Sequence, residues 1–186
     1  LTLFDLGYID LQDRSNTEIL FHLIIKKVVT ILGVSSRELR DIQENLQERY
    51  LLNCSIFQSL PDYWGLGQTF PVMPIQKLDV RPTRSASLWD ITCDSDGEIA
   101  FNVKNPLYLH DIDLEHEEYF LAFFLVGAYQ EVLGMQHNLF THPTEVTVSF
   151  KEDGSYEIGN IIQAQNLLDI LDDLDYDIKE IEVLLK

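Results

Sequence analysis

A short segment that combines one thiol with two carboxylates is the part of this sequence best suited to chemistry. Residues 93–97 (Cys-Asp-Ser-Asp-Gly) follow an apolar stretch that is predicted to be a strand, so their side chains should lie at a strand end. They could form an ordinary β-turn, in which Asp and Gly supply the turn geometry and the cysteine packs in the core. They could also be catalytic, with the thiol donating a proton and the carboxylates binding a cation. A calcium loop is excluded, because Thr92 and Val103 would stand at the first and last ligand positions.

A second candidate is an acidic loop with two imidazoles. Its members are His110, Asp111, Asp113, Glu115 and His116. These side chains are metal ligands in other proteins, but the loop lacks the regular helix-face spacing of a compact site, so we predict no metal here. The roles of this loop and of His137 stay open.

A third candidate, Gly127 to Tyr129, ends an apolar stretch and precedes a predicted helix. Glycine permits close backbone approach, while the tyrosine hydroxyl could bind a phosphate or the ring could complete a core. The residues alone favour the core. The sequence has no G-x-S-x-G motif, P-loop or dinucleotide fingerprint.

Helices are expected at both ends of the chain. Ser15 and Glu18 have the spacing of a capping box and begin an apolar pattern of helical period, which predicts a helix over residues 15–33. Ser35 and Glu38 repeat the spacing and predict a second helix to about residue 50. Together they would form a helical hairpin.

Short apolar runs broken by Pro and Gly predict β structure in the middle of the chain. The candidate strands cover residues 55–58, 70–74, 86–92, 99–103, 119–127, 145–150 and 155–158. Asp153 and Gly154 predict a hairpin turn between the last two strands. The expected class is α+β: a helical segment (1–52), a mainly β part (53–159) and an acidic helical tail (160–186).

The composition excludes several classes of protein. With 13 Lys and Arg against 31 Asp and Glu, the formal charge is −18, which argues against binding to nucleic acids or anionic membranes. The apolar fraction of 46% is too high for a disordered acidic tail. Because the only cysteines, Cys54 and Cys93, form no disulfide framework and no signal peptide is evident, we expect a cytoplasmic protein.

Three long blocks resemble a known family. They are residues 55–65 (SIFQSLPDYWG), 89–97 (WDITCDSDG) and 123–140 (FFLVGAYQEVLGMQHNLF). In type and order they are similar to the biosynthetic arginine decarboxylases, which are pyridoxal-phosphate enzymes of the alanine racemase and ornithine decarboxylase fold type. That family pairs an N-terminal (β/α)8 barrel with a C-terminal β-barrel domain, so the resemblance implies a mainly antiparallel β-barrel or sandwich over residues 53–159. This sequence resembles only the second part, with its helical additions.

The resemblance implies roles for particular residues. Cys93 matches the cysteine that enters the active site of the neighbouring subunit and protonates the substrate α-carbon after CO2 leaves. Asp94 matches the carboxylate that meets the distal cation of the substrate, and Asp96 would add a second contact. Tyr129, with Gly127, matches the position that binds the cofactor phosphate.

The resemblance also implies an activity, the conversion of L-arginine to agmatine and CO2 for polyamine and spermidine biosynthesis. Pyridoxal 5'-phosphate would be the cofactor, with Mg²⁺ as a further ion, and the enzyme would be a homodimer or larger. No lysine of this chain stands in the setting of the Schiff-base lysine, so we expect the chain alone to be inactive. The alternatives are a decarboxylase of lysine, ornithine or diaminopimelate, and a non-catalytic acidic β-barrel interaction module.

Overall fold

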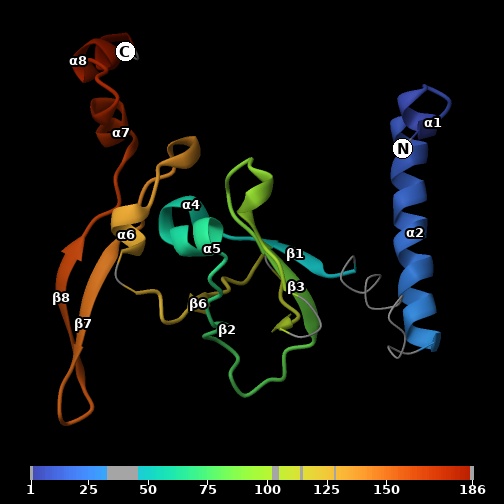
Figure 1. Ribbon diagram of the computed structural model, residues 1–186, viewed down its shortest axis with the longest axis horizontal. Helices are drawn as coiled ribbons and strands as arrows, with labels where there is room; N and C mark the ends of the chain where they lie inside the picture. Colours follow the sequence, from blue (N-terminus) through green and yellow to red (C-terminus); the bar gives the residue numbers. More distant parts are fainter. Residues whose placement is uncertain (1, 33–45, 102–104, 114, 128, 185–186) are drawn as a thin grey trace. The chain divides into compact units, whose positions relative to one another are not determined.

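The computed structural model describes residues 2–32, 46–101, 105–113, 115–127 and 129–184, and the chain is coloured from N- to C-terminus in Figure 1. It divides into two compact units. Unit 1 comprises Leu1–Arg49, Lys77–Ser87 and Ala100–Glu118, and unit 2 comprises Tyr50–Gln76, Leu88–Ile99 and Tyr119–Lys186. None of the helices in the described part of the chain combines the length and the hydrophobicity that a membrane span requires.

The N-terminal helix is confirmed, but it begins earlier than predicted. After α1 (Thr2–Asp5), α2 runs from Leu11 to Leu32. The Asp10 carboxylate accepts a hydrogen bond from the Asp13 N–H at 2.8 Å and so satisfies a donor of the first helical turn. The predicted capping box is therefore wrong, because Ser15 and Glu18 both lie inside the helix.

The predicted second helix is wrong where the structure describes it. Its first part, residues 35–45, lies outside the described residues, and its end is the strand β1 (Glu48–Leu51). β1 lies beside β3 (Arg84–Trp89), and directly after β1 the Leu52 N–H donates to the Trp89 carbonyl at 2.6 Å. Pairing with a distant strand has overridden the local helical spacing.

The central sheet has the order β1-β3-β4, and β5 also pairs with β3. β4 (Glu98–Ile99) is antiparallel to β3 with Leu88 opposite Ile99. β5 (Leu107–Leu109) was not predicted, and its Leu107 lies opposite Ala86. The core of unit 1 contains Ala86, Leu107 and Leu109, and that of unit 2 contains Ile56, Phe57 and Leu88.

Two further sheets belong to unit 2, and each has two antiparallel strands. β2 (Val72–Pro74) pairs with β6 (Leu121–Phe123), and β7 (Glu145–Phe150) pairs with β8 (Tyr156–Ile162). The β7–β8 hairpin confirms the predicted turn, where Gly154 adopts φ 82°. Because β8 extends to Ile162, the helical tail begins later, as α7 (Leu167–Asp173) and α8 (Ile178–Leu184).

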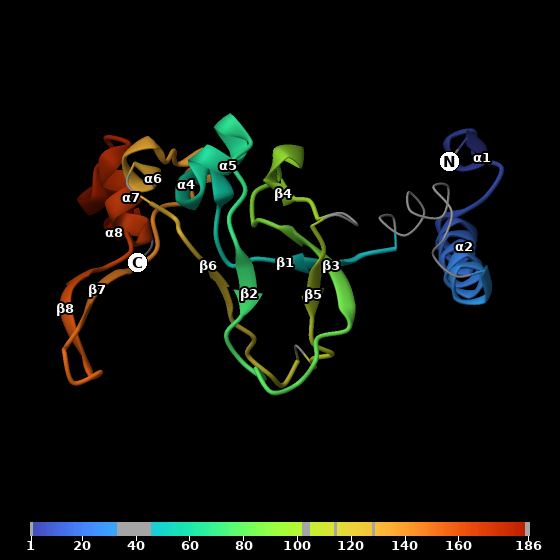
Figure 2. The same ribbon diagram turned by 60° about the horizontal axis from the view of Figure 1, so that its bottom comes forward.

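The predicted strand over residues 55–58 is also wrong. These residues lie in α4 (Ile56–Ser59), which contacts α5 (Pro61–Leu66) and α6 (Gln130–Leu133), and the three helices are grouped together in Figures 1 and 2. The mixed α+β class is confirmed. The barrel is not, since the sheets of the described residues are open and β2–β6 and β7–β8 pair only within themselves.

Candidate functional site

The Cys-Asp-Ser-Asp-Gly segment lies where the sequence predicts it, in the connection between β3 and β4. Residues Ser95–Gly97 form one 3-10 turn, η1, whose N-cap is Asp94. The Asp94 Oδ1 accepts a hydrogen bond from the Asp96 N–H at 2.9 Å. Cys93 and Asp96 are exposed, and Asp94 is half-buried. The turn therefore presents a thiol and two carboxylates at the strand end.

A buried carboxylate, Asp90, holds the base of this turn. Only 3% of Asp90 is exposed. Its Oδ1 accepts from the N–H and the hydroxyl of Thr92 at 2.9 and 2.7 Å, and its Oδ2 accepts from the N–H of Ile56 at 3.0 Å. The Thr92 hydroxyl in turn accepts from the Asp94 N–H at 3.3 Å. One carboxylate thus ties the first residue of α4 to the candidate site.

Gly97 closes the turn against the same carboxylate. A Cβ atom at this position would lie 2.2 Å from the Asp90 Oδ1, far inside van der Waals contact. The Gly97 carbonyl also accepts from the Asp90 N–H at 2.9 Å. Glycine is therefore required here for close approach, and its backbone shows no positive φ.

The two cysteines differ in environment. Burial, and secondarily the negative charge of Asp90, raises the pKa of the Cys54 thiol from its usual 9.0 to about 11. Cys93 is exposed, and both thiols are free of disulfide bonds. Cys54 is consequently held as a neutral thiol, whereas Cys93 is accessible to a substrate or a reagent.

Two neighbouring residues that the sequence did not single out as site residues contact the turn. The His137 Nε2 lies 3.2 Å from the Asp94 Oδ2, and the Asn138 Oδ1 lies 3.6 Å from the Cys93 Sγ. His137 was left without a role, and nothing in the spacing pointed to Asn138. The one signal available was their place within the third family-like block, residues 123–140.

The predicted phosphate-binding residues lie before α6. Tyr129 is the N-cap of α6 in a left-handed conformation with φ 80°, and 72% of its surface is exposed. Its side chain makes no hydrogen bond to the described residues, so the hydroxyl is available as one phosphate donor. A Cβ on Gly127 would meet nothing within 4 Å, so this structure shows no close approach that requires glycine there.

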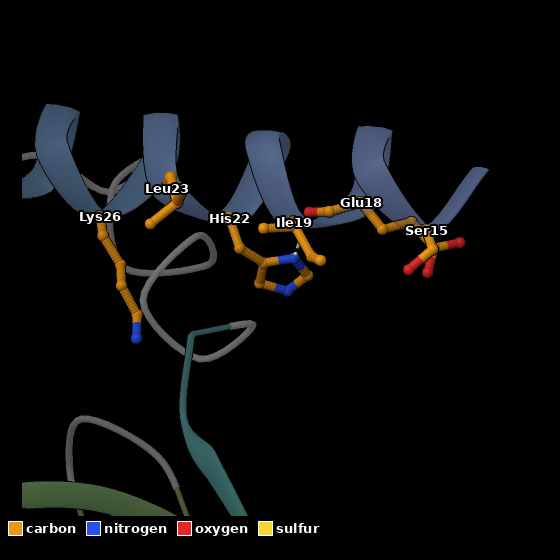
Figure 3. A pocket seen from close by; sticks show the side chains of 6 residues that line it. All are labelled: Ser15, Glu18, Ile19, His22, Leu23 and Lys26. Atoms are coloured by element: carbon orange, nitrogen blue, oxygen red, sulfur yellow. Dashed lines mark hydrogen bonds between the residues drawn. The ribbon is translucent and has the colours of Figure 1, made fainter. Parts of the chain in front are cut away.

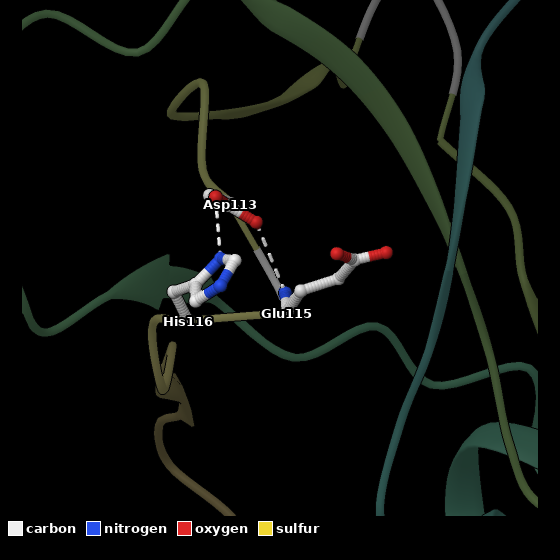
Figure 4. Close-up of side chains that lie close together, drawn as sticks. All are labelled: Asp113, Glu115 and His116. Atoms are coloured by element: carbon white, nitrogen blue, oxygen red, sulfur yellow. Dashed lines mark hydrogen bonds and ion pairs between the residues drawn. The ribbon is translucent and has the colours of Figure 1, made fainter.

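The acidic loop gathers three potential ligands in unit 1, as Figure 4 shows for Asp113, Glu115 and His116. All three are exposed, and their ligand atoms lie within 4.8 Å of one another. Local bonds explain this proximity: the Asp113 carboxylate pairs with the His116 Nδ1 at 2.8 Å and accepts from the Glu115 N–H at 3.1 Å. The arrangement is that of an ordinary acidic turn.

A shallow hollow lies along one face of α2, and Figure 3 shows the side chains that line it. Ile19, Leu23 and Lys26 follow the helical period along this face, and the His22 Nδ1 lies 2.9 Å from the Glu18 carbonyl. The hollow is an open helix surface without a convergent set of reactive groups. It is therefore a weaker candidate than the turn after β3.

Replacement of the buried carboxylate should destabilise the fold. Asp90→Ala leaves the buried N–H of Ile56 and the donors of Thr92 without their acceptor, which should lower the free energy of unfolding by about 3 kcal/mol. Chemical denaturation of the full-length protein measures this change. Asp172→Ala, at an exposed acidic residue of α7 in the same unit, is the comparison. An Asp90→Ala protein as stable as the wild type would contradict the assigned support role.

Alkylation should distinguish the two cysteines. At pH 8 the raised pKa of Cys54 lowers its thiolate fraction roughly 100-fold relative to an ordinary thiol, so iodoacetamide should modify Cys93 first. Peptide mass spectrometry of the native protein over a time course provides the measurement. Equal rates in the native state would show that Cys54 is not protected, whereas equal rates after denaturation are the expected control result.

Comparison with known proteins relates this chain to a family of enzymes. A family model described as the arginine decarboxylase helical bundle domain matches residues 1–47. Biosynthetic arginine decarboxylases of Bacteroides thetaiotaomicron and Deinococcus radiodurans are 44% and 39% identical to this chain over 97% and 94% of its length. The chain spans 30% and 27% of the length of these relatives.

A solved structure agrees with the sequence relatives. The crystal structure of the biosynthetic arginine decarboxylase SpeA from Campylobacter jejuni matches this chain with a TM-score of 0.83 and 64% sequence identity. The match covers 99% of this chain and 29% of that one. The chain therefore belongs to the biosynthetic arginine decarboxylase family and corresponds to somewhat less than a third of its members' length.

Proposed function

We propose that this chain is the part of a pyridoxal-phosphate-dependent arginine decarboxylase that supplies the proton donor and a substrate-binding carboxylate. The reaction converts L-arginine to agmatine and CO2. The observation that carries the proposal is the exposed Cys93 beside Asp94, in a turn that a buried carboxylate supports from below. The similarity to enzymes of that name over nearly the whole chain supports arginine as the substrate.

In this proposal Cys93 acts as the general acid. After CO2 departs, the substrate α-carbon carries the electron pair of the broken bond and must receive a proton. An exposed thiol can approach that carbon and donate its hydrogen. Cys93 lies in the connection between β3 and η1, whose backbone is held by the hydrogen bonds among Asp90, Thr92 and Asp94.

Asp94 is suited to the distal end of the substrate. Its carboxylate is oriented from both oxygens, by the Asp96 N–H at 2.9 Å and by the His137 imidazole at 3.2 Å. A guanidinium donates in a planar fork, so an oriented carboxylate binds it more strongly than a freely rotating one. Asp96 is exposed one turn away and would add negative charge at the same end.

The cofactor fits the chain only in part. Pyridoxal phosphate, when bound, accepts the electron pair released by decarboxylation into its ring. From this chain, the exposed hydroxyl of Tyr129 would donate to a phosphate oxygen, next to Gly127. One hydroxyl does not complete a phosphate site, so the remaining donors and the Schiff-base lysine would come from outside the 186 residues. The purified chain should therefore form no stable imine with the cofactor.

A second copy of the same enzyme is the proposed partner. Cys93 would then act on a substrate bound by the neighbouring copy, with the thiol reaching across a symmetric interface. The exposure of Cys93 supports this arrangement, because a donor that serves another copy must reach the surface of its own.

Activity of the full-length protein tests the proposal. Expressed from its full-length coding sequence and supplied with pyridoxal phosphate, the protein should release CO2 from L-arginine. Cys93→Ala should reduce agmatine formation by about 100-fold or more, because a general acid contributes at least that factor, while cofactor binding is retained. Release of labelled CO2 and chromatography of the product are the measurements. Turnover with lysine, ornithine or diaminopimelate but not arginine would contradict the proposed substrate.

Removal of the tyrosine hydroxyl should weaken cofactor binding. Tyr129→Phe preserves the ring and the left-handed backbone and loses only one donor to a charged phosphate, so the Kd for pyridoxal phosphate should rise about tenfold. Titration of the cofactor-free full-length enzyme gives this value. Tyr156→Phe, at another exposed tyrosine, is the matched control. An unchanged Kd in Tyr129→Phe would remove this residue from the phosphate site.

A further inference from the structure

Two adjacent residues of one segment contact the two adjacent residues of the proposed site. His137 lies against Asp94, and Asn138 lies against Cys93. Cys93 and Asn138 are 45 residues apart in the sequence, so local chain geometry does not force the pairing. The segment that carries them is η2 (His137–Leu139), which belongs to the same unit as the turn after β3.

The hydrogen bonds of Asn138 define how its amide is oriented. Its Oδ1 lies 3.3 Å from the backbone nitrogen of Cys93, and a backbone N–H can only donate, so the amide oxygen must face it. The same oxygen lies 3.6 Å from the Sγ. The thiol is therefore the donor in this second contact, and Asn138 holds the sulfur atom in one position.

His137 is held by the core and holds Asp94 in turn. Its ring packs on Phe57 with centroids 4.4 Å apart and an interplanar angle of 35°, and Phe57 is only 2% exposed. The Nε2 of the same ring lies 3.2 Å from the Asp94 Oδ2. Because Phe57 holds the imidazole against the core, the imidazole in turn holds the half-buried carboxylate of Asp94 in one orientation.

The segment preceding η2 is fixed to α4. A Cβ on Gly134 would lie 2.4 Å from the Gln58 carbonyl oxygen, so the two backbones are in close contact, and the Met135 N–H donates to the Phe57 carbonyl at 3.1 Å. Asn138 and Leu139 then adopt φ 55° and 62°. A left-handed leucine is sparsely populated, so this backbone conformation depends on its surroundings.

We propose that His137 and Asn138 are positioning residues, with His137 orienting Asp94 for the distal cation of the substrate and Asn138 orienting the thiol of Cys93 for proton donation. The inference rests on the proposed function of the turn. It assigns the two residues separate effects, one on substrate binding and the other on the chemical step. A purely structural role would move both kinetic parameters together.

Kinetics of the full-length enzyme test the role of His137. His137→Ala should raise the KM for arginine about fivefold to tenfold and leave kcat within about twofold, since it acts on a binding group. His137→Gln restores a side-chain donor and should recover most of the affinity. In an Asp94→Ala background, His137→Ala should add nothing further.

The variants of Asn138 separate the side chain from the backbone. Asn138→Gly permits the same left-handed φ and removes the amide, so kcat for agmatine formation should fall about tenfold with KM unchanged. Asn138→Asp keeps an acceptor oxygen and should retain most of kcat. In a Cys93→Ala background, Asn138→Gly should have no effect. His142→Gln and Asn160→Ala, outside η2, are the matched controls.

The outcomes distinguish this inference from the function on which it rests. If Cys93→Ala and Asp94→Ala impair turnover while His137→Ala and Asn138→Gly behave as wild type, only the positioning roles are overturned. The positioning roles are also overturned if each of the two variants lowers kcat and raises KM by the same factor and neither His137→Gln nor Asn138→Asp restores activity. If Cys93→Ala and Asp94→Ala leave turnover intact, the proposed site falls and this inference with it.

Discussion

The buried carboxylate of Asp90 is the interaction on which the candidate site depends. A charge that is 97% removed from solvent is costly unless hydrogen bonds compensate it, and here donors from Ile56 and Thr92 surround it. The segments that carry Ile56 and Thr92 are also joined by backbone hydrogen bonds, from the Leu52 N–H to the Trp89 carbonyl and from the Ile91 N–H to the Cys54 carbonyl. The hydrogen bond from the Ile56 N–H to Asp90 adds a side-chain link between the start of α4 and the connection after β3. The lack of a side chain at Gly97 leaves room for the Asp90 carboxylate.

The site extends outward from that buried group in two directions. Thr92 connects Asp90 to the backbone of Asp94, and α4 connects it to Phe57, on which His137 packs. Both sets of contacts end at the exposed turn that contains Cys93 and Asp94. A buried carboxylate with paired oxygens thus supports reactive groups that solvent can reach. This is the arrangement expected of a site that binds its partners from outside. Burial of Cys54 raises the pKa of its thiol, so Cys54 stays neutral and belongs to the structure that supports the turn.

The sequence predicted the elements whose formation depends on local pattern. The β7–β8 hairpin has its turn at Gly154 as the Asp-Gly pair indicates, and α2 follows the apolar period. The strand predicted over residues 55–58 forms a helix instead, because its first N–H is accepted by a carboxylate 34 residues away. The end of the predicted second helix is β1 for a similar reason, since its partner strand lies far along the chain.

The candidate site, like the fold, could be predicted from the sequence only in part. Cys93 and Asp94 were predicted as site residues from residue type, spacing and resemblance, and the structure places them in the connection between β3 and η1. Asn138 was not found, because an asparagine in a loop has many uses and only the fold shows that its amide faces Cys93. Closure of the sheets into a barrel was expected from the resemblance, whereas the described strands of this chain form open sheets.

A structure of the full-length enzyme with pyridoxal phosphate and agmatine bound tests the central claim most directly. The account predicts that the Sγ of Cys93 lies roughly 3–4 Å from the carbon that has lost its carboxylate, in the site of a neighbouring copy, as a proton donor in reacting geometry requires. The guanidinium of the product should lie on the carboxylate of Asp94. A product bound far from both residues, with the turn after β3 facing solvent, would contradict the account.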